Sequence, residues 1–149
     1  MCFLFKKKRE YNSKDSFENY VNVTGYVGKE PIFPIFCYDK VIIEYTIYYN
    51  ILALLNTEMD ISDQDDFLYI DIEGNMFTGY FNKKNRHVLY DLKKIINSVD
   101  FKKIIEECIE DCNYNLKIKG ETIHDMFNEL ILFDKNTIDN PEMRFKEIY

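Results

Sequence analysis

The chain has 149 residues, of which 46% are hydrophobic and 30% are charged, so it fits one ordinary globular domain and is not intrinsically disordered. No apolar run reaches the roughly 20 residues of a membrane-spanning helix, because Glu44 and Asn50 interrupt even the richest stretch, 41–55. The formal net charge of −7 argues against general nucleic-acid binding and favours a basic partner.

The N-terminal residues are basic. Residues 1–5 are apolar and residues 6–9 are Lys-Lys-Lys-Arg, which is the reverse of the order in a secretory signal peptide. We therefore expect no export and a cytoplasmic protein, and we interpret the basic run as a solvated tail. The predicted organisation is a basic N-terminal segment, residues 1–14, followed by a single domain, residues 15–149.

The cysteines favour the same compartment. In a chain without an export signal they are expected to be reduced thiols, as is usual in a cytosol. They are Cys2, Cys37, Cys108 and Cys112.

A strand and a helix are the first elements predicted along the chain. Approximate alternation of polar and apolar residues predicts a strand over 17–27 that ends near Gly28. Two prolines keep 29–35 extended, and Asp39 is placed to cap a helix over about 40–56. The β-branched residues of that last stretch would also suit a buried strand, but its length favours a helix.

The strongest local pattern is that of a β-hairpin. Residues 67–72 and 76–81 are aromatic and β-branched runs, and Glu-Gly-Asn at 73–75 supplies the residue types of a tight turn. A polar stretch at 82–86 follows and predicts a loop. These residues therefore predict two antiparallel strands joined by a short turn.

Helices are expected next, over 88–97 and 100–113. Asp100 is a natural N-cap for the second of them. The apolar residues of this second helix recur at helical spacing and form one stripe toward the core: Phe101, Ile104, Ile105, Cys108, Ile109 and Cys112.

The last third of the chain predicts a short strand and a further helix. Residues 116–119 alternate like a strand, Gly120 ends it, and apolar spacing predicts a helix over 122–133, with a last turn after Pro141. Strands mixed with helices, without regular βαβ alternation, predict an α+β fold. We expect an antiparallel sheet that includes the 67–81 hairpin and packs against amphipathic helices.

No pattern in the sequence predicts an enzyme, a cofactor or a metal site. Cys108 and Cys112 lie on the apolar stripe with no further ligand at zinc-site spacing. The acidic stretch 60–71 lacks the glycine and the final glutamate of a calcium-binding loop. The alternative that stays open is a small enzyme, a nuclease or metal-dependent hydrolase, that uses His87 or His124 with nearby acids.

Charge is distributed unevenly along the chain. Between Lys40 and Lys83 there is no lysine or arginine, and the acids of that stretch sum to −8. Tyrosine and phenylalanine rings fall in the same stretch, and such rings beside carboxylates suit recognition of a cationic protein. The predicted partner-binding residues are Glu58, Asp60, Asp63, Asp65, Asp66, Tyr69, Asp71 and Glu73.

The helix predicted over 100–113 also has an acidic face. Glu106, Glu107, Glu110 and Asp111 lie opposite its apolar stripe, and the last two oppose the helix dipole, so local stability does not account for them. A plain acidic surface that keeps the protein in solution is the competing interpretation. Clustering of one sign favours a partner instead, because solubility is served by interspersed signs.

The chain resembles immunity proteins of bacterial toxin systems, including contact-dependent growth inhibition. The resemblance lies in overall size, in the Met-x-x-Leu-Phe-Lys-Lys start within residues 1–8 and in the acidic, tyrosine-rich body. It implies a protein that binds a cognate toxin domain, often a basic nuclease, and covers its active site by charge and shape. The expected partner is thus a basic toxin domain, not nucleic acid or a membrane. A viral or host-directed interaction protein would use the same binding logic.

Overall fold

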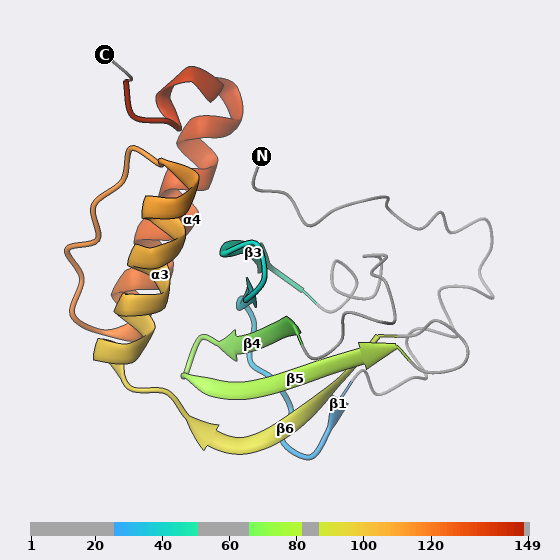
Figure 1. The fold of residues 1–149 in the computed structure, drawn as a ribbon. Coiled ribbons are helices and arrows are strands. Elements are labelled where there is room, and N and C mark those ends of the chain that lie inside the picture. The colour runs from blue at the N-terminus through green and yellow to red at the C-terminus, as the bar shows by residue number, and fades with distance from the viewer. Residues whose placement is uncertain (1–25, 51–65, 82–86, 148–149) are drawn as a thin grey trace.

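The computed structural model describes residues 26–50, 66–81 and 87–147. Within them lie a six-stranded sheet and two α-helices, so the predicted α+β fold is confirmed (Figure 1). Both faces of the sheet and the inner faces of the helices supply the buried core.

The sheet has the strand order β1-β6-β5-β4-β2-β3. Within it, β1 and β6 are parallel and the other neighbouring strands are antiparallel, as the sequence predicts for most of the sheet. The strands are β1 (Tyr26–Val27), β2 (Ile35–Asp39), β3 (Glu44–Tyr48), β4 (Phe67–Asp71), β5 (Asn75–Phe81) and β6 (His87–Ile95).

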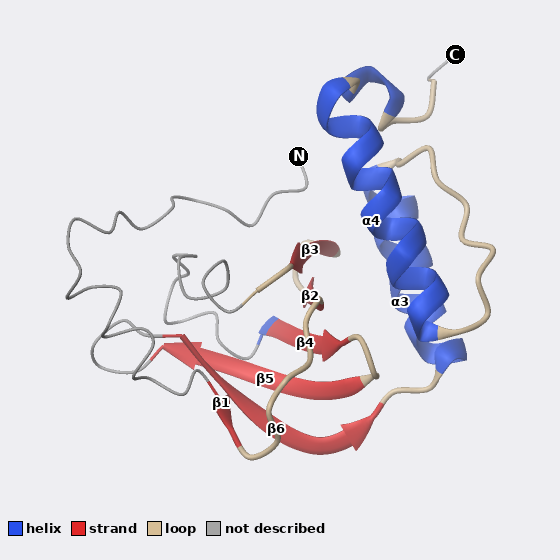
Figure 2. Ribbon diagram, turned by 180° about the vertical axis from the view of Figure 1, so that it is seen from behind, coloured by secondary structure: helices blue, strands red, loops and turns tan. Residues whose placement is uncertain are grey.

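The helices lie side by side on one side of the sheet (Figures 1 and 2). They are α3 (Ser98–Cys112) and α4 (Ile123–Asp139), and a short 3-10 helix, η2 (Pro141–Met143), follows. Side chains cap both N-termini: Asn97 Oδ1 accepts from the Asp100 amide at 2.8 Å, and Thr122 Oγ1 accepts from the Asp125 amide at 3.1 Å. Both predicted helices are confirmed, but Asn97 rather than Asp100 is the N-cap of α3.

Alternation along the strands divides the interior into two clusters. Phe36 lies toward the helices, where it stacks on Tyr45 and meets Phe101 edge-on, with ring centroids 5.2 Å apart in each case. Its neighbour Ile35 belongs to the second cluster, because successive strand residues point to opposite faces. The second cluster contains Ile35, Cys37, Tyr48, Phe67, Tyr69, Phe77 and Leu89.

The predicted helix over 40–56 is wrong over its described part, which is a turn followed by β3. Asp39 does cap the turn, because its Oδ1 accepts from the amides of Val41 at 2.9 Å and Ile42 at 3.3 Å. The helical turn then stops at Ile43, whose φ of 54° reverses the chain into β3. Residues 51–56 lie outside the described residues.

The predicted helix over 88–97 is also wrong, since most of it belongs to β6. The strand is irregular: Phe77 pairs with Asp91 but Asn75 pairs with Ile95, so β6 holds extra residues opposite β5. Within the bulge, Lys93 has a φ of 55° and its amide donates to Asp91 Oδ1 at 2.7 Å. The bulge breaks the two-residue period of the strand. The spacing of apolar residues over 88–97 therefore resembles that of a helix.

The hairpin prediction is confirmed by β4 and β5, whose turn includes Gly74 at a φ of 88°. The predicted strand at 116–119 is not formed, because these residues are extended without strand pairing. Of the predicted strand over 17–27, Tyr26–Val27 forms β1 and the rest lies outside the described residues, as does the loop at 82–86. Pro141 begins the expected last turn.

The cysteines differ from the expectation of four reduced thiols. Cys37 and Cys108 are free and buried, but Cys112 is disulfide-bonded. With Cys112 in a disulfide, the cysteines do not indicate a cytosolic location. Among the described residues, no helix has the length and apolar character needed to cross a bilayer.

Candidate protein-binding site

The structure does not place the predicted partner-binding residues on one surface. Glu73 is exposed and Asp66 is half-buried, but Tyr69 keeps 1% of its surface exposed and Asp71 keeps none. The others lie outside the described residues; they are Glu58, Asp60, Asp63 and Asp65. The assignment of Tyr69 and Asp71 to a docking surface is therefore wrong.

Asp71 is buried because the hairpin uses its carboxylate internally. Oδ1 accepts from the amides of Glu73 at 3.0 Å and Asn75 at 2.8 Å, and Oδ2 accepts from the Ile32 amide at 3.1 Å and the Asn75 side-chain amide at 2.9 Å. These bonds satisfy the donors of the β4–β5 turn. Asp71 is thus a structural residue, although its charge counted toward the acidic stretch.

The aromatic residues of the same stretch also face inward. The buried ones are Tyr45, Tyr48, Phe67, Tyr69 and Phe77, whereas Tyr49 keeps 50% of its surface exposed. Their rings fill the two clusters on the sheet faces. The idea that phenol rings and carboxylates are displayed together is therefore wrong for the described part of that stretch.

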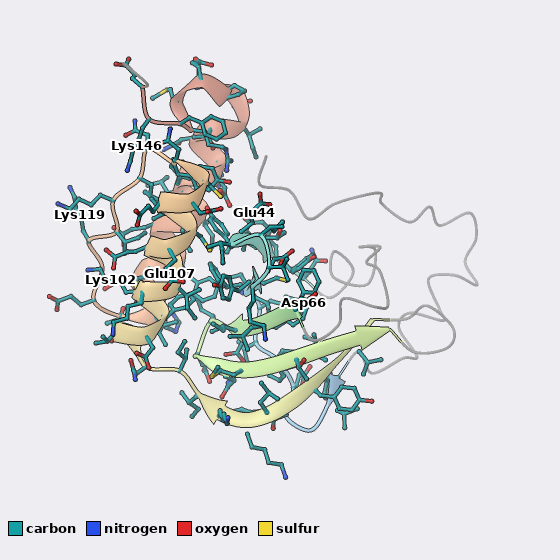
Figure 3. The ribbon with its side chains drawn as sticks, in the orientation of Figure 1. Glu44, Asp66, Lys102, Glu107, Lys119 and Lys146 are labelled. Carbon is teal, nitrogen blue, oxygen red and sulfur yellow. The ribbon has the colours of Figure 1, made fainter. Side chains whose placement is uncertain are left out.

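Carboxylates gather elsewhere, where the β2–β3 turn meets α3. We call Asp39, Glu44, Glu107 and Asp111 the acidic cluster. Asp39 and Glu44 are directly paired across β2 and β3, and Figure 3 shows Glu44 beside the helix that bears Glu107. Glu107 and Asp111 are one turn apart on α3 and exposed. The cluster therefore joins residues that are far apart in the sequence.

Cys108 shows that these carboxylates share one neighbourhood. Burial raises the pKa of its thiol to about 12, and the negative charges of Glu107, Asp111, Glu44 and Asp39 add to the increase in that order. All four members of the acidic cluster thus act on a single sulfur atom. The thiol remains protonated at neutral pH and is not a nucleophile.

Glu44 is the most deeply placed member of the acidic cluster. The residue keeps 7% of its surface exposed, and its buried Oε2 has no hydrogen-bond partner. Burial raises the pKa of this carboxyl, the positive N-terminal amino group of the chain lowers it, and the charges of Asp39 and Asp111 raise it. A buried carboxylate without a donor is costly, so Glu44 is incompletely satisfied in the structure.

The negative charge of α3 also acts on the neighbouring Tyr38. Its pKa is raised by burial first and then by the charges of Cys108 and Glu107. The tyrosine therefore stays neutral at pH 7.

The acidic cluster has no built-in cation among the described residues. The ion pair that this part of the chain does contain joins Arg144 Nη1 to Asp134 Oδ1 at 3.5 Å, and neither residue belongs to the cluster. Lys40 follows Asp39 in the chain but forms no ion pair with the cluster. Figure 3 shows Lys119 on the loop between α3 and α4, on the side away from the sheet. The exposed carboxylates of Glu107 and Asp111 therefore have no ion-pair partner among the described residues, whereas the N-terminal amino group acts on the charge of Glu44.

Exposed apolar residues flank the acidic cluster. The β2–β3 turn presents Val41 and Ile42, which keep 65% and 44% of their surfaces exposed. They directly follow Asp39 and Lys40 in the chain. Apolar contact area is therefore exposed next to the carboxylates of the acidic cluster.

The residues of the enzyme alternative form no recognisable site in the described part of the chain. His124 is exposed in the first turn of α4, and the side chain of His87 lies outside the description. The described residues contain no group of three or more His, Cys, Asp or Glu that could hold a metal ion. No observation favours developing this alternative.

Comparison with protein-family models, with curated proteins and with solved structures finds no match to this chain. The sequence did contain a usable signal, since Glu107 and Asp111 lie on the polar face of a confirmed helix. Their connection to Asp39 and Glu44 depends on the β2–β3 turn, which the predicted helix over 40–56 concealed.

Proposed function

We propose that this protein is a protein-binding module of the immunity type, whose acidic cluster docks a basic domain of a cognate toxin and neutralises it. The observation that supports this most is the acidic cluster itself. The charges of four carboxylates, two on α3 and two at the facing ends of β2 and β3, all act on the Cys108 thiol, and none of the four forms an ion pair among the described residues. The proposal places the protein in the cytoplasm, where a nuclease-like toxin would act.

Electrostatics gives the proposal its physical basis. Unpaired carboxylates of one sign raise the encounter rate with a cationic protein and select against acidic partners. Lysine and arginine side chains of the partner would pair with Glu107 and Asp111 at the exposed edge, while Val41 and Ile42 supply apolar contact area. The proposed docking surface thus uses the start of the acidic stretch, where Val41, Ile42 and Glu44 lie, rather than the residues over 58–73 that the sequence favoured.

Growth protection tests this function. The protein would be co-expressed in bacteria with the toxin domain encoded by the neighbouring gene, and survival compared between the wild type and a double charge reversal, Glu107→Lys with Asp111→Lys. We expect the double variant to lose protection, because two repulsive charges replace two attractive ones. The matched control reverses two exposed acids outside the acidic cluster, Glu121→Lys with Asp139→Lys, and should protect like the wild type.

Association kinetics give a second measure. Binding of the purified toxin domain should slow steeply between about 50 and about 500 mM salt, because screening shortens the reach of the acidic cluster. Protection that survives the double reversal, or an association rate indifferent to salt, would overturn the proposal. Absence of a toxin domain among the neighbouring genes would overturn the immunity role.

A further inference from the structure

We propose that Cys112 is bonded to Cys2, and that this disulfide holds the basic run at residues 6–9 against the acidic face of α3. The bond is a site of reversible oxidation, which thiol reductants open. Its consequence for docking rests on the proposed function, because the basic run and a basic toxin domain would compete for the same carboxylates.

The cysteines of the chain leave one partner for Cys112. The sequence contains four cysteines. Cys112 is disulfide-bonded, whereas Cys37 and Cys108 are free. The fourth is Cys2, which lies outside the described residues. Because the other two thiols are free, the sulfur bonded to Cys112 is assigned to Cys2.

The charge of the N-terminus gives independent support. Cys112 Sγ lies 3.9 Å from the carbonyl oxygen of Ile43, which directly precedes Glu44. The N-terminal amino group, one residue before Cys2, lowers the pKa of Glu44. A charge has this effect on a group in its own neighbourhood. The disulfide and the amino group therefore point to the same region of the fold, where the β2–β3 turn meets α3.

Cys112 also differs from the free cysteines in its exposure. It is half-buried at the last residue of α3, whereas Cys37 and Cys108 keep none of their surface exposed. Burial raises the pKa of the Cys108 thiol to about 12, so that thiol stays protonated and does not take part in exchange. A reductant can therefore reach Cys112 while the buried thiols stay unreactive.

A bond at this position brings opposite charges within reach of each other. Glu107 and Asp111 are exposed, and they precede Cys112 by at most about 8 Å along the helix axis. An extended chain spans about 3.4 Å per residue, so residues 6–9, which follow Cys2 closely, can reach both carboxylates. Attraction between the two signs favours this contact. In the oxidised protein the basic run would thus cover part of the docking surface.

The chemistry is thiol–disulfide exchange. When the bond forms, the two protein thiols give two electrons and two protons to one oxidised glutathione, which leaves as two reduced glutathione molecules. When it opens, a dithiol such as dithiothreitol supplies the electrons and protons and becomes its own disulfide. Disulfides in a reducing cytosol are usually transient and redox-sensing. Opening of the Cys112 bond would therefore expose the acidic cluster to a partner.

Mass spectrometry of the full chain tests the bond. The protein is equilibrated with oxidised and reduced glutathione, and its free thiols are alkylated under denaturing conditions. Digestion with trypsin and a glutamate-specific protease then cuts after Glu110, between Cys108 and Cys112. We expect a Cys2 peptide linked to a Cys112 peptide, and alkylation of the other two cysteines. Cys112→Ser should lose this link, and the control Cys108→Ala should keep it.

Three results would overturn the bond. They are a link from Cys2 to Cys108, a link between two copies of the chain, and full alkylation of Cys2 after oxidation. Each is read from the wild-type protein, so a variant that fails to fold does not affect the result.

A basic peptide tests the contact with the acidic face. The full chain is titrated by NMR with acetyl-Lys-Lys-Lys-Arg-amide, which has the sequence of the basic run. Because a tethered competitor has a high effective concentration, the oxidised wild type should bind the peptide about fivefold more weakly than the reduced wild type. Cys2→Ser should bind like the reduced wild type under both conditions. Oxidation should also make no difference after removal of the basic charges by Lys6→Gln, Lys7→Gln, Lys8→Gln and Arg9→Gln.

The contact and the proposed function can fail separately. If the oxidised and reduced wild types bind the peptide equally while the Glu107→Lys, Asp111→Lys variant loses growth protection, the contact is wrong and the proposed function stands. If oxidation weakens peptide binding but the double reversal still protects, the contact stands and the toxin-docking function is wrong.

Discussion

Glu44 and Asp134 are both carboxylates whose pKa is raised chiefly by burial, yet their hydrogen bonds and ion pairs differ. Asp134 Oδ1 accepts from the Tyr45 hydroxyl at 3.2 Å and pairs with Arg144 Nη1 at 3.5 Å. The buried Oε2 of Glu44 has no hydrogen-bond partner. Both carboxylates thus have a positive group of the chain acting on them, but only Asp134 is hydrogen-bonded and ion-paired by described side chains, whereas Glu44 Oε2 accepts no hydrogen bond.

Arg144, which pairs with Asp134, also makes contacts that stabilise the fold. Its guanidinium lies over the rings of Tyr114 and Phe133, 5.2 Å from each centroid, and its carbonyl accepts from the Asn115 amide at 2.7 Å. These contacts attach the C-terminal residues to α4 and to the loop after α3. A paired buried carboxylate therefore serves the architecture of the protein.

Removing the Asp71 carboxylate should have the largest effect on stability. Asp71→Ala leaves buried turn donors without acceptors, so we expect the free energy of unfolding to fall by about 3 kcal/mol. Urea denaturation would measure it, with the exposed neighbour Glu73→Ala as control, expected to stay within about 0.5 kcal/mol. If Asp71→Ala lowered the free energy of unfolding only slightly, hydrogen bonds within the chain would not explain how Asp71 differs from Glu44.

Removing Arg144, the cation that pairs with Asp134, should have the next largest effect on stability. Arg144→Met leaves a largely buried acid unpaired and removes the contacts with two rings, so we expect a loss of about 2 kcal/mol, discounted for partial exposure. The exposed Lys146→Met is the control. The double variant Asp134→Asn, Arg144→Met should recover part of the loss. Failure to recover any of it would indicate that the guanidinium acts through packing alone.

Neutralising Glu44 should act in the opposite direction. Glu44→Gln removes a buried carboxylate whose Oε2 has no hydrogen-bond partner, so we expect a gain of about 1 kcal/mol in urea denaturation at pH 7. The same change at the exposed Glu121 should be neutral. Destabilisation by Glu44→Gln would mean that the carboxylate already has a stabilising role in the free protein.

The pH dependence of that gain sharpens the comparison further. Because the pKa of Glu44 is higher in the folded than in the unfolded protein, its contribution to stability is fully present below the unfolded pKa and is lost as the pH rises through the folded pKa. The advantage of Glu44→Gln should therefore shrink as the pH falls from 7 and vanish near about pH 4. A constant advantage across this range would contradict the assigned cause.

Local sequence patterns predicted the elements whose structure depends mainly on their own residues. The apolar residues of α3 lie on one face of the helix, which packs in the core. The β4–β5 turn has a glycine at the position that needs a positive φ. Fold class followed from these elements. The two wrong helices failed for tertiary reasons: Ile43 adopts a positive φ that no propensity foretells, and the bulge at Lys93 hides the period of β6.

The candidate site was harder to predict than the fold. Counting acids along the chain gave Asp71 the same weight as Glu44, although one is bonded by turn amides and the other is not. Whether a carboxylate is available depends on the donors that folding brings to it. Those donors come from other segments, so charge clustering in the sequence located a stretch but not the surface.

The parallel pairing of β1 with β6 also has a kinetic consequence. Tyr26 pairs with Leu89, so the sheet is complete only after the first and last strands described have met across the whole intervening chain. The β4–β5 hairpin and α3 depend on near neighbours and can form early. Contacts of such long sequence separation slow folding, so closure of this edge is expected to govern how fast newly made chains reach the native state.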